Sequence, residues 1–193
     1  MTSKNNPKIL SQNTTSKSRS KTATILLVLL IFQMFFIFAM SSFGPDSSNA
    51  QSNFFVDLIS GLVPIKSGPV EPALDLKTII FFVRKTAHFT EYAILGLLFY
   101  LNLQYHSSKK QSPRLFALAI LFSALYACTD EFHQLFVPGR TGQIFDVFVD
   151  TLGATFGCLI VLAVQIIRRR LAQNQKTSYS SPSLIKSDKS KTS

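Results

Sequence analysis

Apolar residues occur in four long runs, separated by short segments rich in Lys, Ser, Asn and Pro. The runs cover residues 22–40, about 76–103, 115–137 and 144–167. A helix needs about 20 predominantly apolar residues to cross the hydrocarbon core of a bilayer, and each run is close to or above that length. The pattern predicts an all-α integral membrane bundle of about four transmembrane helices.

The composition agrees with this prediction, because 47% of the 193 residues are hydrophobic and only 16% are charged. The first run follows Lys17, Arg19 and Lys21, so a secretory signal peptide is an alternative interpretation of it. The run is longer than the apolar region of about 7–15 residues in such peptides, and it lacks an A-x-A cleavage site. We therefore expect an uncleaved helix.

Basic residues indicate the orientation, because Lys and Arg near the ends of membrane spans are retained on the cytoplasmic side. They gather in the N-terminal tail, in the loop after the second run and in the C-terminal tail. With these segments inside, only five of the 20 basic residues lie outside: Lys66, Lys77, Arg84, Lys85 and Arg140. We expect both termini in the cytoplasm, and the net charge of +10 to attract anionic membrane lipids rather than nucleic acid.

Three segments flank or separate the spans. The tails, residues 1–20 and 173–193, are rich in Ser, Thr, Asn and Lys, and we expect them to be disordered. The external segment, residues 41–75, has apolar residues at helical spacing in its middle: Phe54, Phe55, Leu58, Ile59 and Leu62. This spacing indicates either a short amphipathic helix on the outer surface or a cap packed over the bundle.

Ionisable and polar residues cluster near the outer ends of three predicted spans. The second span carries Arg84, Lys85, His88, Glu91 and Tyr92; the third ends with Asp130, Glu131, His133 and Gln134; and Arg140, Asp146 and Asp150 follow. A carboxylate in the hydrocarbon region costs about 3 kcal/mol on insertion scales unless it faces a partner or water. Their common depth therefore predicts that these side chains meet in one polar pocket.

The fourth span has a stripe of small residues below its acids, because Asp146, Asp150, Gly153 and Gly157 share one helical face. Glycines let a neighbouring helix approach closely, so this face should turn towards the bundle. A structural ion-pair network that fixes helix register also explains the charges without a ligand. Histidine side chains ordinarily titrate near neutral pH, so His88 and His133 suit proton transfer or metal ligation.

At these positions the chain resembles the VanZ-like family, named for a small bacterial membrane protein associated with teicoplanin resistance. The matching segments are residues 84–96 and 129–157. The family pattern is roughly K-x-x-H-x-x-E-Y, then D-E-x-x-Q, then R, then D with a following Asn and paired glycines. The residues that align are Lys85, His88, Glu91, Tyr92, Asp130, Glu131, His133, Gln134, Arg140, Asp146, Gly153 and Gly157. Where the family usually has Asn, this chain has Asp150.

The resemblance covers residues 76–167 and implies a role at the bacterial cell envelope, linked to teicoplanin-type glycopeptide resistance, without naming a reaction. Three functions fit the residues. The first is a binding protein for a lipid headgroup or envelope precursor, with Arg140, Arg84 and Lys85 on its phosphate. The second is an enzyme acting on a lipid-linked substrate, with His88 or His133 as base and carboxylates as acids or ligands of a divalent metal. The spacing lacks the H-E-x-x-H pattern of a metal site. The third, an ion pathway, fits least because the cytoplasmic halves of the spans are apolar.

Overall fold

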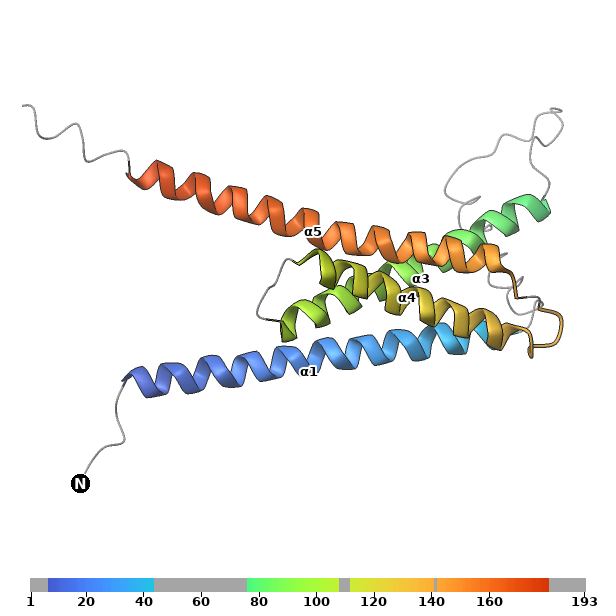
Figure 1. Cartoon of the computed structure of the whole chain (residues 1–193), viewed down its shortest axis with the longest axis horizontal. Helices are drawn as coiled ribbons and strands as arrows, with labels where there is room; N and C mark the ends of the chain where they lie inside the picture. The colour runs from blue at the N-terminus through green and yellow to red at the C-terminus, as the bar shows by residue number, and fades with distance from the viewer. Residues whose placement is uncertain (1–6, 44–75, 108–111, 141, 181–193) are drawn as a thin grey trace, which may run out of the picture. The chain divides into compact units, whose positions relative to one another are not determined.

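The computed structural model describes residues 7–43, 76–107, 112–140 and 142–180 (Figure 1). These residues form four α-helices and no strand: α1 (Pro7–Ser41), α3 (Leu76–His106), α4 (Pro113–Gln134) and α5 (Ile144–Ser180). The predicted all-α class is therefore confirmed. The amphipathic pattern around residues 54–62 lies outside the described residues.

The helix boundaries follow local sequence signals. Ser112 caps α4, since its hydroxyl accepts a hydrogen bond from the Arg114 backbone N–H at 3.3 Å, and Pro113 occupies the first helical turn. The same helix ends at Gln134, before the end of the third apolar run at residue 137. Pro138 accounts for the early end, because the residue before a proline is disfavoured in the α conformation.

Both terminal helices extend into the predicted tails. α1 begins at Pro7 and α5 continues to Ser180, so both helices include residues of the segments for which disorder was expected. Extending an existing helix costs far less than nucleating a new one, because each added residue gains one hydrogen bond. The apolar spans therefore act as nuclei from which helix propagates into polar sequence.

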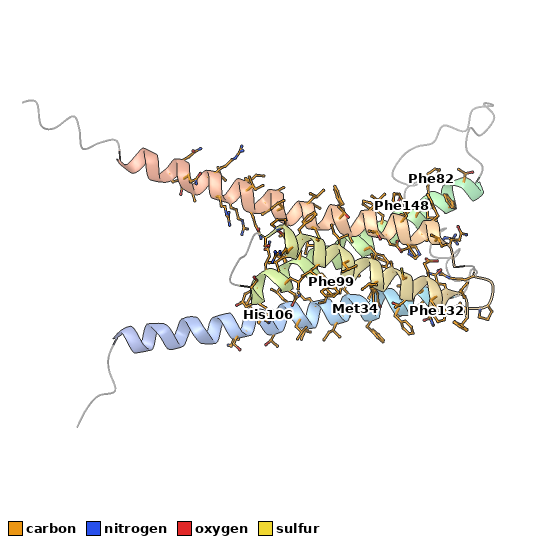
Figure 2. All side chains as sticks on the ribbon, viewed as in Figure 1. Met34, Phe82, Phe99, His106, Phe132 and Phe148 are labelled. Carbon is orange, nitrogen blue, oxygen red and sulfur yellow. The ribbon has the colours of Figure 1, made fainter. Side chains whose placement is uncertain are left out.

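Three helical segments of the described chain are long and apolar enough to cross a membrane: Ser20–Ser41, Pro113–Gln134 and Ile144–Gln175. Many of their large side chains are exposed, including Phe35 at 67% and Phe132 at 63%. Phe82 on α3 and Phe148 on α5 are exposed as well (Figure 2). Helix surfaces with so many exposed apolar side chains suit contact with lipid rather than with water, and they indicate a membrane protein. The crossing of α3, which is 31 residues long, stays a prediction.

Helices α1, α3 and α4 pack against one another. Their core includes Leu30 and Ile37 of α1, Tyr92 and Leu95 of α3, and Ala127 of α4. Polar side chains add links between the helices, as membrane bundles commonly require. These links are Gln33 Nε2 to the Glu91 carbonyl at 3.0 Å, Asn102 Nδ2 to the Leu26 carbonyl at 3.0 Å, and Tyr126 OH to the Met34 carbonyl at 2.5 Å.

The chain divides into two compact units, residues 1–158 and 159–193. In the first unit, the beginning of α5 lies directly against α3. A Cβ atom on Gly153 would collide with the Phe89 carbonyl, and one on Gly157 would collide with the Ala93 carbonyl. Cys158 Sγ also donates to the Gly96 carbonyl at 3.3 Å. Backbone thus meets backbone along the glycine stripe, which brings the acids above it close to α3.

Candidate functional site

The C-terminal end of α4 carries two buried carboxylates. Asp130 accepts hydrogen bonds from the Ser41 hydroxyl and, at 3.2 Å, from Gln134 Nε2. Glu131 accepts from the same amide at 3.4 Å and from the Gln143 backbone N–H at 2.7 Å. The acids at this end of α4 are therefore held by a serine from α1 and by backbone that leads into α5.

A tight turn follows α4 and positions Arg140. Gly139 has a φ of 79°, a left-handed conformation that favours glycine over other residues. The turn closes with a hydrogen bond from the Arg140 N–H to the Val137 carbonyl at 3.1 Å. The Arg140 side chain then points towards α1, because its Nε donates to the Phe43 carbonyl at 2.8 Å.

Helices α3 and α5 present two acid–base pairs one turn apart. The Lys85 ammonium pairs with the Asp146 carboxylate, and both side chains are largely buried. Further along the same faces, His88 Nδ1 lies 3.9 Å from Asp150 Oδ1. The glycine contacts below them explain this juxtaposition, since they fix how closely the two helices approach.

Residues at the end of the first helix also contribute to the site. The sequence analysis did not predict this contribution. Ser41 binds Asp130, Ser42 Oγ lies 3.1 Å from His133 Nε2, and the ring of Phe38 lies 4.4 Å from the His133 ring. Sequence reasoning limited the cluster to three helices. The available signal was the position of Ser41 and Ser42 at the end of the first apolar run, at the same depth as the acids.

The site also has two arginines without an acidic partner. In the described chain, the ion pairs within 4.0 Å are Lys85–Asp146 and His88–Asp150, and neither Arg84 nor Arg140 takes part. Burial lowers the pKa of the Arg140 guanidinium from its usual range, and the positive charge of Arg84 lowers it further, although nearby carboxylates oppose the effect. Arg140 nevertheless stays protonated, because guanidinium does not lose its proton in proteins.

The structure brings the predicted site residues to one end of the bundle, together with Arg84, Ser41 and Ser42, and we call this set the polar cluster. Its members are Ser41, Ser42, Arg84, Lys85, His88, Glu91, Tyr92, Asp130, Glu131, His133, Gln134, Arg140, Asp146 and Asp150. Glu91 lies within electrostatic range of Asp130 and Arg140. Tyr92 is fully buried. Among the described residues, no three His, Cys, Asp or Glu side chains are arranged to hold a metal ion.

Comparison with known protein families supports the resemblance carried by these residues. The model of the VanZ/LLP1 family matches residues 26–167, which is most of the chain. The chain belongs to the VanZ/LLP1 family. The match begins within the apolar part of α1, so it includes the end of this helix with Ser41 and the adjoining Ser42. No curated protein and no solved structure matches this VanZ/LLP1 chain significantly.

Proposed function

We propose that this VanZ/LLP1 protein binds the phosphate group of a lipid headgroup or envelope precursor at its polar cluster. In this proposal the chain crosses the bacterial cell membrane several times with both termini in the cytoplasm, which places the polar cluster in the outer leaflet. Family membership suggests an envelope protein linked to glycopeptide resistance. Sequestration of an envelope precursor from the antibiotic would connect binding with that phenotype.

The observation that carries the proposal is the pair of arginines without acidic partners. Arg84 and Arg140 lie within electrostatic range of one another, and no carboxylate of the described chain is within ion-pair distance of either. Two positive charges held close together repel one another, and an anion bound between them offsets this repulsion. Guanidinium binds phosphate through two parallel hydrogen bonds, which makes arginine well suited to this ligand.

Lys85 has a different role from the one the sequence suggested. It was expected to contact phosphate with the arginines, but its ammonium is paired with Asp146. Binding phosphate would require Lys85 to leave a largely buried carboxylate unpaired, which is costly. The proposed phosphate contacts therefore belong to Arg84 and Arg140, and Lys85 positions α5 against α3.

The experiment compares lipid retention by native mass spectrometry after release of the protein from nanodiscs that contain phosphatidylglycerol. We expect Arg84→Gln and Arg140→Gln each to lower retention about tenfold or more, since a charge-assisted hydrogen bond contributes about 1.5–3 kcal/mol. Arg114→Gln is the matched control, because Arg114 is exposed at the opposite end of α4. Arg84 makes no hydrogen bond or ion pair within the described chain. The Arg84→Gln substitution therefore tests phosphate binding without removing either kind of contact. Retention unchanged in both variants would exclude the proposal.

A further inference from the structure

Three buried polar groups of the polar cluster have no hydrogen-bond partner among the described residues. These groups are the carboxylate of Asp150, with both of its oxygens, the Nδ1 atom of His88 and the hydroxyl of Tyr92. Asp150 and Tyr92 are each 0% exposed. A buried polar group without a partner costs about 1–3 kcal/mol, and a charged group costs more. Such a set of buried unsatisfied groups calls for an additional hydrogen-bond partner at this position.

His88 and Asp150 face one another between α3 and α5, and Tyr92, which also packs in the core of α1, α3 and α4, lies within electrostatic range of Asp130 and Asp150. His88 and Tyr92 are four residues apart on α3, so they lie on one face of that helix. His88 Nδ1 is 3.9 Å from Asp150 Oδ1. Asp150 is also one turn beyond Asp146, whose carboxylate Lys85 already neutralises.

We propose that His88, Tyr92 and Asp150 form a subsite for a primary ammonium group, so that the ligand carries both a phosphate and an amine. This inference rests on the proposed phosphate site and specifies the rest of its ligand. An ammonium has three N–H donors, and the subsite offers the Asp150 carboxylate, the unprotonated Nδ1 of one histidine tautomer and the tyrosine oxygen as acceptors.

The charge distribution supports a cationic group at this position. Four other carboxyl groups lie within electrostatic range of Asp150, namely Glu91, Asp130, Glu131 and Asp146. Of the acidic side chains, only Asp146 pairs with a Lys or Arg within the described residues. An additional positive charge among these acids is favourable, whereas a second anionic group would be repelled.

The spacing of the two subsites fits a small ligand. His88 is four residues beyond Arg84 on α3, which corresponds to about 6 Å along a helix axis. A short linker of two or three carbon atoms between phosphate and amine covers such a span. The chemistry is shared by a phospholipid headgroup with an amine and by a free phosphorylated amine.

The test uses two pairs of probes, and each pair contains one molecule with an amine and one without. Calorimetry on the detergent-purified protein compares O-phosphoethanolamine with glycerol 1-phosphate, and native mass spectrometry compares phosphatidylethanolamine with phosphatidylglycerol. We expect at least about a tenfold preference for the amine in one pair, consistent with one charge-assisted hydrogen bond. The pair that shows the preference identifies the source as a free molecule or a lipid.

Asp150→Asn should bring this preference close to one, because the amine-bearing probe loses its ionic partner. Asn has nearly the same shape, and Asp150 has no hydrogen bond to lose within the described chain. Tyr92→Phe, which keeps the buried ring, should lower the preference to a smaller extent. A preference that persists in Asp150→Asn, or no preference in the wild type, overturns the amine subsite.

The outcomes also separate this inference from the proposed function. Equal binding of both members in both pairs, lost in Arg140→Gln, rejects the amine subsite and leaves the phosphate site in place. Failure of the wild type to bind any of the four probes rejects both proposals.

Discussion

The hydroxyl of Ser41 at the end of α1 donates a hydrogen bond to the buried carboxylate of Asp130 on α4. Ser41 is 2% exposed, so water does not readily replace it as a donor. This contact joins the first helix to the polar cluster.

We expect Ser41→Ala to destabilise the protein, because Asp130 loses a hydrogen bond in a buried position. The cost should be about 1–3 kcal/mol, measured as a lower midpoint of thermal unfolding in detergent. Thr90→Ala is the control, since the exposed Thr90 hydroxyl bonds only the Thr86 carbonyl within its own helix. Equal midpoints for Ser41→Ala and the wild type would contradict this role of Ser41.

The Lys85–Asp146 pair predicts a non-additive response to mutation. Lys85→Met leaves the Asp146 carboxylate largely buried without its cation, and removing one member of a buried pair costs about 3–5 kcal/mol. The double variant Lys85→Met with Asp146→Leu should be more stable than Lys85→Met alone, because no charge remains unpaired. A double-mutant cycle of thermal midpoints measures the coupling, and simple additivity would argue against the pair.

The sequence predicted the parts of this structure that depend on length and small-residue spacing. α3 and α5 begin at Leu76 and Ile144, where the second and fourth apolar runs begin. The spacing of Gly153 and Gly157 predicted a close helix contact, and their Cα atoms do lie against α3 backbone. These features follow from local patterns, because hydrophobic length and missing side chains can be read directly from residue types.

The partners within the polar cluster could not be predicted in the same way. Lys85, Arg84 and Arg140 can each pair with an acid, and only helix rotation decides that Lys85 meets Asp146. Ser41 has no periodic signature, so its bond to Asp130 depends on how α1 packs. The helical extensions of α1 and α5 also escaped prediction, because polar composition alone does not reveal propagation from a neighbouring apolar helix.

The glycine stripe should tolerate no added side chain. Gly157→Val places atoms where the Ala93 carbonyl lies, and overpacking of this kind costs about 1–3 kcal/mol. We expect a lower thermal midpoint and less folded protein on size-exclusion chromatography. Leu152→Val, on an exposed position of the same helix, is the control. If Gly157→Val matches this control, α3 and α5 do not pack as closely as described.

The proposed orientation predicts which loops a membrane-impermeant maleimide can reach. In a background with Cys128→Ala and Cys158→Ala, Pro138→Cys should be labelled in intact cells, because the turn after α4 lies outside. Ser112→Cys, at the opposite end of α4, should be labelled only after the membrane is permeabilised. The reverse pattern would show that the termini are external and that the polar cluster lies in the inner leaflet.

The proposed link to glycopeptide resistance predicts a phenotype that depends on the proposed phosphate contacts. Expression of the chain in a susceptible bacterium should raise the inhibitory concentration of teicoplanin. Arg140→Gln should return this concentration to that of cells with an empty vector, because the guanidinium no longer holds the phosphate of an envelope precursor. Arg114→Gln should keep the wild-type level, since Arg114 is exposed at the other end of α4.

Protein amounts in the membrane must be matched by immunoblotting, because Arg140 also donates to the Phe43 carbonyl and its loss affects stability. Arg84→Gln separates the two effects, since Arg84 makes no hydrogen bond or ion pair within the described chain. If Arg84→Gln lowers both lipid retention and resistance at normal abundance, phosphate binding accounts for the phenotype. If it lowers lipid retention while resistance stays at the wild-type level, resistance arises from another part of the protein.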